Sequence, residues 1–333
     1  MIMAFHPGMG MADPLFTFGI TTYNRQGMLK ECLDSILKQT NPDFEVIVGN
    51  DFTDEILTCE MLGISDPRVR IINHPRTLGE INNMNYLLSE AKGKYFSWLA
   101  DDDLLMPQFL EAIHVALGEF SYPLCIFPSY NEGTEYGLEL VDINSSLRLM
   151  SGYEFLQGYL SRSLKLIGCY GGFKTEYLKD MGGIKALGDG FSPYADNLLA
   201  IKAGKLDRVV YIDAPLIFFR THDQSMSYTS PDLTAYTSAQ RQLLSECDDE
   251  IFGYAGILPR RDQIMFNLLI WCSRDIYSLL YRGASILSRP YIKHLGVLER
   301  YARSTGLLYP KFLLFNLWFV ARYLAKSFLK RTA

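Results

Sequence analysis

The 333-residue chain has no low-complexity segment, no internal repeat and no uninterrupted apolar run of about 18 residues. With 48% apolar and 21% charged residues, its composition is that of neither a disordered nor a collagen-like chain. The apolar runs are too short to predict a membrane-spanning helix. The first residues also lack the basic start and apolar core of a secretory signal peptide. We therefore expect a globular protein, either two units or one large domain with an extension.

Closely spaced cysteine pairs are also absent. The chain has six cysteines but no C-x-x-C pair, which argues against a zinc site and against a disulfide framework. We expect buried free thiols and a reducing, cytoplasmic location. The cysteines are Cys32, Cys59, Cys125, Cys169, Cys247 and Cys272.

Two common phosphate-binding loops are missing as well. The chain contains neither G-x-G-x-x-G nor G-x-x-x-x-G-K-[ST]. These glycine patterns let the backbone approach phosphates closely, so their absence argues against dinucleotide enzymes and P-loop ATPases.

Charge is distributed unevenly along the chain. The net charge is −5, but residues 1–250 hold 19 Lys and Arg against 34 Asp and Glu, a net of −15. Residues 251–333 hold 13 against 3, a net of +10. An acidic body thus precedes a basic tail, and basic tails are attracted to anionic surfaces such as lipid or nucleic acid.

The first part of the chain alternates short apolar runs with helical patterns. Near-continuous apolar runs predict strands buried on both faces, as in a parallel sheet. Apolar positions at helical spacing, one set beginning at Met28, separate these runs, and a further helix begins near Pro107. The order predicts a doubly wound α/β sandwich, which binds ligands at the carboxyl ends of its strands. The predicted strands are Leu15–Thr21, Phe44–Asn50, Val69–Asn73 and Lys94–Ala100, and Gly79–Ala91 is a predicted helix.

The pattern loosens after Tyr130. We predict a hairpin over 131–143, helices over 151–161 and 194–204, and strands over 207–213 and 215–221. From about Ser230 onward the chain is predicted to be wholly helical. Three prolines, Pro259, Pro290 and Pro310, fall near the expected starts of three helices.

Three consecutive aspartates, Asp101, Asp102 and Asp103, follow the last of the four predicted strands. Their mutual repulsion calls for a cation, and Mg²⁺ typically takes one or two carboxylates together with substrate phosphates. Capping of a helix N-terminus explains one aspartate but not three. The run therefore predicts a site for a divalent cation and a phosphate.

With this run in place, residues 1–225 resemble glycosyltransferase family 2. Six segments match the family in order and spacing: TTYNR (21–25), VIVGNDFTDE (46–55), LGEINNMN (78–85), AKGKYFSWLADDDLLMP (91–107), YADNLLAIKAG (194–204) and FFRTHDQSMS (218–227). The resemblance implies the GT-A fold, a Rossmann-like, mixed and mostly parallel sheet flanked by helices, here with a helical C-terminal extension. It also implies an inverting, metal-dependent enzyme that uses a nucleotide-sugar donor.

The resemblance assigns the nucleotide-sugar site to the ends of the strands. The residues that it implies are Thr22, Tyr23, Arg25, Asp51, Arg76, Asn85, Asp101 and Asp102. Asp51 would accept a hydrogen bond from the base, although relatives commonly show two acids where this chain has Asn50 and Asp51. A turn or cap acid is the other interpretation of Asp51.

The same resemblance assigns the phosphate and metal contacts. Asp101 would contact the ribose and Asp103 would ligate Mg²⁺ or Mn²⁺, with Asp102 a second candidate ligand. His222 would assist the metal and Arg220 the diphosphate.

The acceptor side needs a base to take a proton from the attacking hydroxyl. Asp196 occupies that place in the resemblance, while the preceding Ala195 replaces a frequent Glu; a helix cap is the alternative role of Asp196. Asp189 is a weaker candidate base. Gly168, Gly171 and Gly172 resemble the acceptor-pocket strand of the family, but glycines also simply permit tight turns.

The C-terminal residues favour contact with a membrane surface. Lys311, Arg322, Lys326 and Lys330 share one helical face, and apolar and aromatic residues cover much of the rest. This pattern is typical of a helix lying in the plane of a membrane interface. A helix packed on the domain or a homo-oligomer interface are the alternatives. Nucleic-acid binding is disfavoured, because the basic residues alternate with apolar bulk.

These observations predict a glycosyltransferase of surface-polysaccharide synthesis that acts on a glycan or lipid-linked acceptor, peripheral on the inner face of the cell membrane. A non-catalytic nucleotide-sugar-binding scaffold and a nucleotidyltransferase remain the alternatives. We expect a tail (1–13), a catalytic domain (14–228, with a nucleotide-sugar half over 14–130 and an acceptor half over 131–228) and a helical region (229–333).

Overall fold

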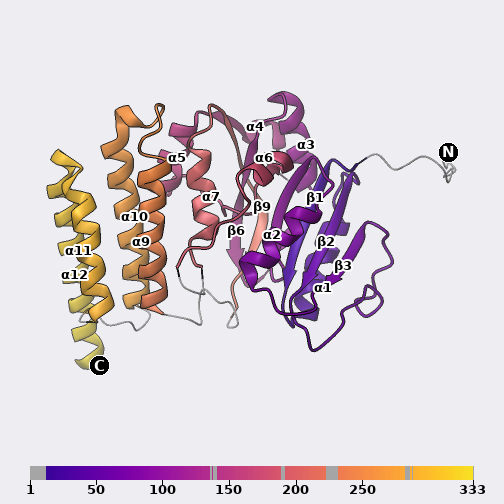
Figure 1. Ribbon diagram of the computed structural model, residues 1–333, viewed down its shortest axis with the longest axis horizontal. Helices are drawn as coiled ribbons and strands as arrows, with labels where there is room; N and C mark the ends of the chain where they lie inside the picture. Colours follow the sequence, from indigo (N-terminus) through magenta and orange to yellow (C-terminus); the bar gives the residue numbers. More distant parts are fainter. Residues whose placement is uncertain are drawn as a thin grey trace.

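The structure is a computed structural model that describes residues 13–135, 137, 141–188, 192–222, 232–281, 286 and 288–332, with side chains up to residue 325. An α/β part carries the N-terminus, and a stack of long helices forms the opposite end of the molecule (Figure 1). The predicted tail, apart from Asp13, and the candidate base Asp189 lie outside the described residues.

The α/β part is built on a nine-stranded mixed sheet with the order β3-β2-β1-β4-β8-β6-β9-β5, and β7 pairs with β9. The first four strands are parallel and confirm the predicted ones to within one residue at each end. They are β1 (Phe16–Thr22), β2 (Phe44–Asn50), β3 (Val69–Asn73) and β4 (Tyr95–Ala100). Thr22 pairs with Asn50, and Thr21 with Ala100, so the carboxyl ends of three strands meet at one edge.

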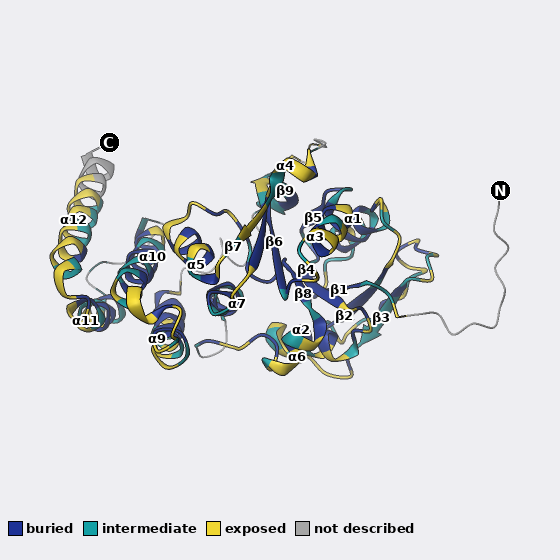
Figure 2. Ribbon diagram, turned by 90° about the horizontal axis from the view of Figure 1, so that it is seen from above, coloured by how far each residue is buried: buried dark blue, intermediate teal, exposed yellow. Residues whose placement is uncertain are grey.

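Helices cover both faces of these strands, which explains their near-continuous apolar sequences. In Figure 2, α1 (Gln26–Leu37) and α3 (Phe109–Glu119) lie on one face, and α2 (Glu80–Glu90) and α6 (Thr175–Asp180) on the other. The Phe109 ring packs edge-on against Phe16. On the opposite face, the indole N–H of Trp98 donates to the carbonyl of Met84 at 2.8 Å.

The remaining strands make the sheet mixed. They are β5 (Leu104–Leu105), β6 (Cys125–Gly133), β7 (Leu147–Met150), β8 (Gly172–Lys174) and β9 (Val209–Arg220). β8 runs antiparallel to β4 and β6, whereas β6 and β9 are parallel. The sheet is therefore mixed, as the resemblance implies, rather than purely parallel and doubly wound.

Two predictions in this half were wrong. Residues 207–213 and 215–221 do not form two strands, because Asp213 to Pro215 is an irregularity inside the single strand β9, where the pairing with β6 shifts register. The described part of 131–143 is not a hairpin. Residues 131–133 continue β6 alongside β9, and a short helix, α4 (Ile143–Ser146), follows at the other end.

The predicted helices are present. α5 (Gly152–Ser161) begins at a capping box of Ser151 and Glu154, and α7 (Ala195–Ala203) follows. The described residues after 231 form α9 (Leu233–Glu250), α10 (Arg261–Tyr281), α11 (Arg289–Arg303) and α12 (Tyr309–Thr332), with short 3-10 turns at Leu258–Arg260 and Gly306–Leu308. Pro259 lies in the turn that leads into α10, and Pro290 and Pro310 lie in the first turns of α11 and α12, as expected.

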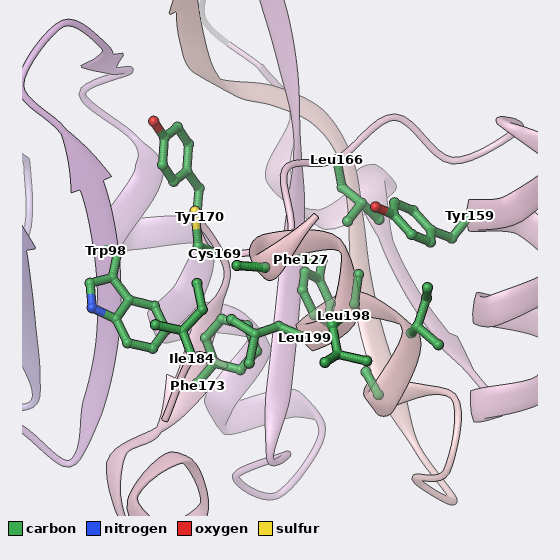
Figure 3. Packing of buried hydrophobic residues seen from close by; sticks show 14 of the residues in the cluster. Trp98, Phe127, Tyr159, Leu166, Cys169, Tyr170, Phe173, Ile184, Leu198 and Leu199 are labelled. Carbon is green, nitrogen blue, oxygen red and sulfur yellow. The ribbon is translucent and has the colours of Figure 1, made fainter. Parts of the chain in front are cut away.

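One continuous core joins the sheet to the helical end. Figure 3 shows aromatic side chains from Trp98 through Phe173 and Phe127 to Tyr159. Tyr194, at the start of α7, then packs edge-on against Trp271 of α10 and accepts a 2.7 Å hydrogen bond from the amide of Gln240. The helical end thus helps to position α7. In the part of the chain that is described, no helix is both long and apolar enough to cross a membrane.

Candidate active site

The site lies at the edge where β1, β2 and β4 end. Thr22 ends β1, Asp51 follows β2, and Asp101 to Asp103 follow β4. Parallel strands direct their carboxyl ends to the same side, so residues far apart in sequence meet there. The structure thus brings these residues together at the carboxyl ends of the strands, where the sequence predicted the site.

Asp101 is buried beneath the site. Its Oδ2 accepts a 2.6 Å hydrogen bond from Thr22 Oγ1, and its Oδ1 lies 2.6 Å from Arg25 Nη2. Burial raises the pKa of Asp101 to about 6, although Arg25 and Thr22 favour the charged form. Thr22, Arg25 and Asp101 therefore form one bonded unit.

Asp103 is also buried, and both of its carboxylate oxygens have protein donors. Tyr170 donates its hydroxyl to Oδ2 at 2.5 Å, and the backbone N–H of Arg220 donates to Oδ1 at 2.9 Å. Burial and the neighbouring charge of Asp102 raise the pKa of Asp103 to about 7, against the effect of these hydrogen bonds. Asp103 ties β9 and the Tyr170 segment to the aspartate loop.

Asp102 is the member of the run whose side chain contacts both Arg25 and His222. Its Oδ2 lies 2.7 Å from Arg25 Nη1 and 3.1 Å from His222 Nε2. Burial lowers the pKa of Arg25, but the charges of Asp101 and Asp102 outweigh this effect, and the net pKa is raised. Arg25 thus acts as the counter-ion of the aspartate run.

Arg220 is bound within the protein rather than directed into open space. Its Nε donates to the backbone carbonyl of Asp102, Nη1 pairs with Glu31, and Nη2 donates to the carbonyl of Met28 at 3.3 Å. This arrangement links β9, the aspartate loop and α1. Arg220 therefore positions the loop in the structure.

A cavity of about 240 Å³ brings the aspartate run and the predicted base together. Asp102, Asp103, Glu80 and Asp196 are the acidic residues of its wall, and Arg25 is the one basic residue among the described residues that line it. The rest of the wall is mostly apolar and aromatic, including Tyr170, Ile184, Phe219 and Tyr236. A carboxylate set of this kind suits a site that receives a cation and a hydroxyl compound.

Asp196 lies in the first turn of α7 and is half-buried. Burial raises its pKa to about 6, the charge of Glu80 adds to the shift, and the backbone amides of Asn197 and Gly168 oppose it. At Gly168 a Cβ atom would lie 1.9 Å from the carbonyl oxygen of Asp196, so this position has no room for a side chain. The glycine signal in the sequence thus has a steric reason.

A second cavity, of about 500 Å³, adjoins the first. Its wall includes Tyr23, whose side chain is 53% exposed and packs edge-on against Phe52, and Asp51. Asp51 accepts backbone hydrogen bonds from Leu78 and Gly79 at 2.6 and 2.8 Å, so it holds the loop before α2. The contacts of Asp51 with the protein are therefore those expected of a turn residue. Asp51 also lines the wall of the second cavity.

Five predicted residues are not among those that line these two cavities: Asp101, Arg220, His222, Asn85 and Arg76. Asn85 brackets Ile184 with its side-chain amide, accepting from the N–H and donating to the C=O, both at 2.9 Å. Asn85 thus fixes a wall residue of the first cavity. Arg76 is exposed in the loop before α2 and lines neither of the two cavities.

Sequence reasoning missed Glu80 and Tyr170. Glu80 lies in the quoted segment LGEINNMN, and its place at a helix start directly beside the strand ends was a signal that could have been used. Nothing in the local sequence distinguishes Tyr170, because its partner Asp103 is 67 residues away.

The donor set fits a divalent cation that is shared with a diphosphate. Asp102 and His222 converge, but the described residues hold no cluster of three or more His, Cys, Asp or Glu able to enclose a metal. Magnesium commonly binds through one or two carboxylates and completes its shell with phosphate oxygens and water. Arg25 would have to leave Asp102 for such a cation to bind.

Comparisons with known proteins show which family this part of the chain resembles. Residues 17–174 match the family model for glycosyl transferase family 2. An uncharacterized glycosyltransferase of Haemophilus influenzae is 34% identical over 102 residues, which are 30% of this chain and 32% of that protein. The chondroitin synthase of Pasteurella multocida is 38% identical over 109 residues, 32% of this chain and 11% of that enzyme. The aligned part of the chain thus spans a third or less of these relatives.

Solved structures resemble the chain over a larger part. Staphylococcus aureus TarS 1-349 in complex with UDP-GlcNAc superimposes with a TM-score of 0.67 at 16% identity, covering 92% of this chain and 89% of that one. The mannosyltransferase PcManGT of Pyrobaculum calidifontis, in complex with GDP-Man and Mn²⁺, gives 0.51 at 16% identity, covering 96% and 88%. Likeness at this identity concerns the fold.

The matched residues 17–174 contain the parallel strands, the aspartate loop and Tyr170. The resemblance seen in the sequence, the mixed sheet and the family match therefore agree. Residues 17–174 thus match glycosyl transferase family 2, and the chain has the GT-A fold.

Proposed function

We propose that the protein is an inverting glycosyltransferase that moves a sugar from a nucleoside diphosphate sugar to a hydroxyl group of a glycan or lipid-linked acceptor. One observation supports this proposal above the others. A single cavity holds Asp102, suited to the diphosphate end of a donor, and Asp196, suited to the acceptor end. A displacement between these two ends, in one step, inverts the anomeric carbon.

The larger cavity is the proposed nucleoside site. Tyr23 offers a half-exposed aromatic ring, and Thr22, Asp51 and Asn83 offer polar atoms near it. The cavity adjoins the Asp102 cavity through shared residues, so a nucleoside here reaches the aspartate run with its diphosphate. The TarS and PcManGT structures hold UDP-GlcNAc and GDP-Man respectively, which supports a donor of this class.

For the divalent cation, Mg²⁺ or Mn²⁺, we propose Asp102 and His222 as the protein ligands. Asp103 was the first candidate in the sequence, but its two oxygens already accept hydrogen bonds from Tyr170 and Arg220. Asp103 then orients the loop that presents Asp102. A bound divalent cation supplies Lewis-acid stabilisation of the leaving diphosphate.

The proposed base is Asp196. Its raised pKa of about 6 leaves it ionised at neutral pH and makes it a stronger base than an ordinary aspartate. It takes the proton of the acceptor hydroxyl as that oxygen attacks the anomeric carbon, and the diphosphate leaves on the opposite side. Apolar and aromatic wall residues such as Tyr236 and Phe219 keep this part of the cavity poor in water.

We also propose that the helical end binds an anionic lipid surface, which supports a lipid-linked acceptor and a role in surface-polysaccharide synthesis at the inner face of the membrane. One face of α12 packs on α10, with Phe319 stacked on Tyr277 at 4.3 Å between ring centroids. The other face exposes apolar side chains, including Leu314 at 67%, Leu317 at 65% and Trp318 at 53%. Lys311 and Arg322 border this apolar face.

The neighbouring helix α11 adds a basic stripe. Its exposed residues include Arg289, Lys293, Arg300 and Arg303, whose spacings of 4, 7 and 3 residues place them on one side of the helix. Arg303 pairs with Glu299 at 2.8 Å. Exposed apolar side chains beside basic ones match a lipid interface with anionic headgroups, whereas two copies of so basic a face would repel each other. The six cysteines, none of which forms a disulfide, fit a reducing compartment.

The donor site is tested by calorimetric binding of UDP, GDP, CDP and dTDP, each with and without Mn²⁺. We expect one nucleotide to bind, and Asp102→Asn to abolish the enhancement by Mn²⁺ while leaving the fold intact. Asp34→Asn is a matched control, because Asp34 pairs with Lys30 on α1 and lines neither cavity. Absence of binding by every nucleotide would overturn the donor site, and binding without sugar transfer to any acceptor would favour a scaffold protein.

A further inference from the structure

Glu80 occupies a special place between the two cavities. It is the first residue of α2, and among the described residues it shares with Arg25 alone a place in the walls of both cavities. The larger cavity is the proposed nucleoside site, and the smaller one holds the proposed base. A donor sugar that joins these two sites must pass Glu80.

The charges around Glu80 define its surroundings. Desolvation by the cavity wall raises the pKa of Glu80, Arg25 lowers it, and Asp102 raises it further. Glu80 in turn raises the pKa of Asp196. Glu80 therefore lies within electrostatic reach of both Asp102, at the diphosphate end, and Asp196, at the acceptor end.

Glu80 differs from Asp51 and the three aspartates of the run in its bonding. Asp51, Asp101, Asp102 and Asp103 each bond to a protein donor. Among the described residues, no hydrogen bond or ion pair joins the Glu80 carboxylate to the protein. Its oxygens are therefore available to a ligand in the cavity.

We propose that Glu80 is a specificity-determining residue that accepts a hydrogen bond from a hydroxyl of the donor sugar and excludes sugars that carry a carboxylate. This inference rests on the proposed function and narrows its donor to an uncharged hexose or N-acetylhexosamine. A carboxylate repels the diphosphate, so the sugar hydroxyls are the part of the donor that it can bind. A uronic acid would bring its own carboxylate to a wall that already holds four acids and only one arginine among the described residues, so repulsion disfavours it.

The test compares the affinities of neutral and uronic donors of the same base. UDP-glucose and UDP-glucuronate, or GDP-mannose and GDP-mannuronate, are titrated by calorimetry in the presence of Mn²⁺. For the wild type we expect the neutral donor to bind roughly tenfold or more tightly than the uronate. Glu80→Gln should bring this ratio close to one, and Glu80→Asp should keep most of it because the charge is retained.

Glu176→Gln is the control, because Glu176 is an exposed glutamate whose side chain is 83% accessible and lines neither cavity. Equal affinity of the wild type for both donors, or an unchanged ratio in Glu80→Gln, overturns the inference. UDP and GDP alone are titrated with each variant. If UDP or GDP binds but the ratio of affinities for neutral and uronic donors does not depend on Glu80, only the inference about Glu80 fails. If the wild type binds no nucleotide at all, the proposed function itself is overturned.

Discussion

The two working ends of the molecule carry opposite charge. The wall of the smaller cavity holds four acids and one arginine, in a body of residues 1–250 with a net charge of −15. The last three helices of the helical end, α10 to α12, lie within residues 251–333, which have a net charge of +10, and they show a basic stripe on α11 beside the apolar face of α12. These four acids line one cavity, whereas the basic residues of α11 are exposed on the surface.

This difference separates two ways of handling an anion. Four acids in one cavity wall disfavour a diphosphate, so we expect its binding to require a cation. The basic helices attract an anionic surface directly, and the acidic body opposes close contact of the remaining molecule. From this charge distribution we expect the helical end, rather than the acidic body, to face an anionic surface.

The largest effect is expected at Asp196. Asp196→Asn removes the proposed base without changing the size of the side chain, and we expect sugar transfer to fall about 10²- to 10⁴-fold. Nucleotide binding should be retained, because Asp196 does not line the larger cavity. Transfer is measured with the donor and acceptor that the wild type uses. A decrease of less than tenfold would contradict the base role.

The basic stripe is the next target. Replacing Arg289, Lys293 and Arg300 by glutamate should weaken binding to anionic vesicles by about 100-fold or more, at about 1 kcal/mol for each basic residue near the surface. Co-sedimentation with vesicles of phosphatidylcholine, with and without phosphatidylglycerol, measures this loss. Lys38→Glu, on the exposed surface of the α/β part, is the control. Equal binding by both variants would assign the stripe another role.

The pH dependence of transfer sharpens the acidic side. The pKa of Asp196 is raised to about 6, and in the proposed mechanism the ionised form takes the proton. We therefore expect the rate to be nearly constant above pH 7 and to fall about tenfold per unit of pH below 6. In Asp196→Asn, the residual rate should no longer fall in this way below pH 6. If the fall in rate below pH 6 persists unchanged in this variant, a titrating side chain other than Asp196 causes it.

The smallest effect is expected at Tyr170. Tyr170→Phe removes the hydroxyl that donates to Asp103 and leaves one oxygen of a buried carboxylate unpaired. We expect a loss of about 1–3 kcal/mol in the free energy of unfolding, measured by urea denaturation. Tyr122→Phe is the matched control, since Tyr122 is 62% exposed. Equal stability of the two variants would show that the hydrogen bond contributes little.

Local pattern determined much of this protein. The alternation of apolar runs and helical stripes predicted β1 to β4 and the helices between them, because spacing along the chain decides which residues face a core. The aspartate run predicted the edge at which the site lies. The prolines likewise predicted where the last helices begin, since a proline suits the first turn of a helix.

Tertiary contacts decided the rest. Asp102, rather than Asp103, contacts His222 and Arg25, because Tyr170 and Arg220, 67 and 117 residues away from Asp103, occupy both oxygens of that carboxylate. The strand pairing of β9 with β6 turned an apparent break at Asp213 to Pro215 into an irregularity of one strand. The joining of Glu80 and Asp196 in one cavity, and the open face of α12, also depend on packing. The hydrophobic periodicity that predicts a helix or strand depends on residues close in sequence, whereas the partners of a side chain come from segments that only the folded chain brings together.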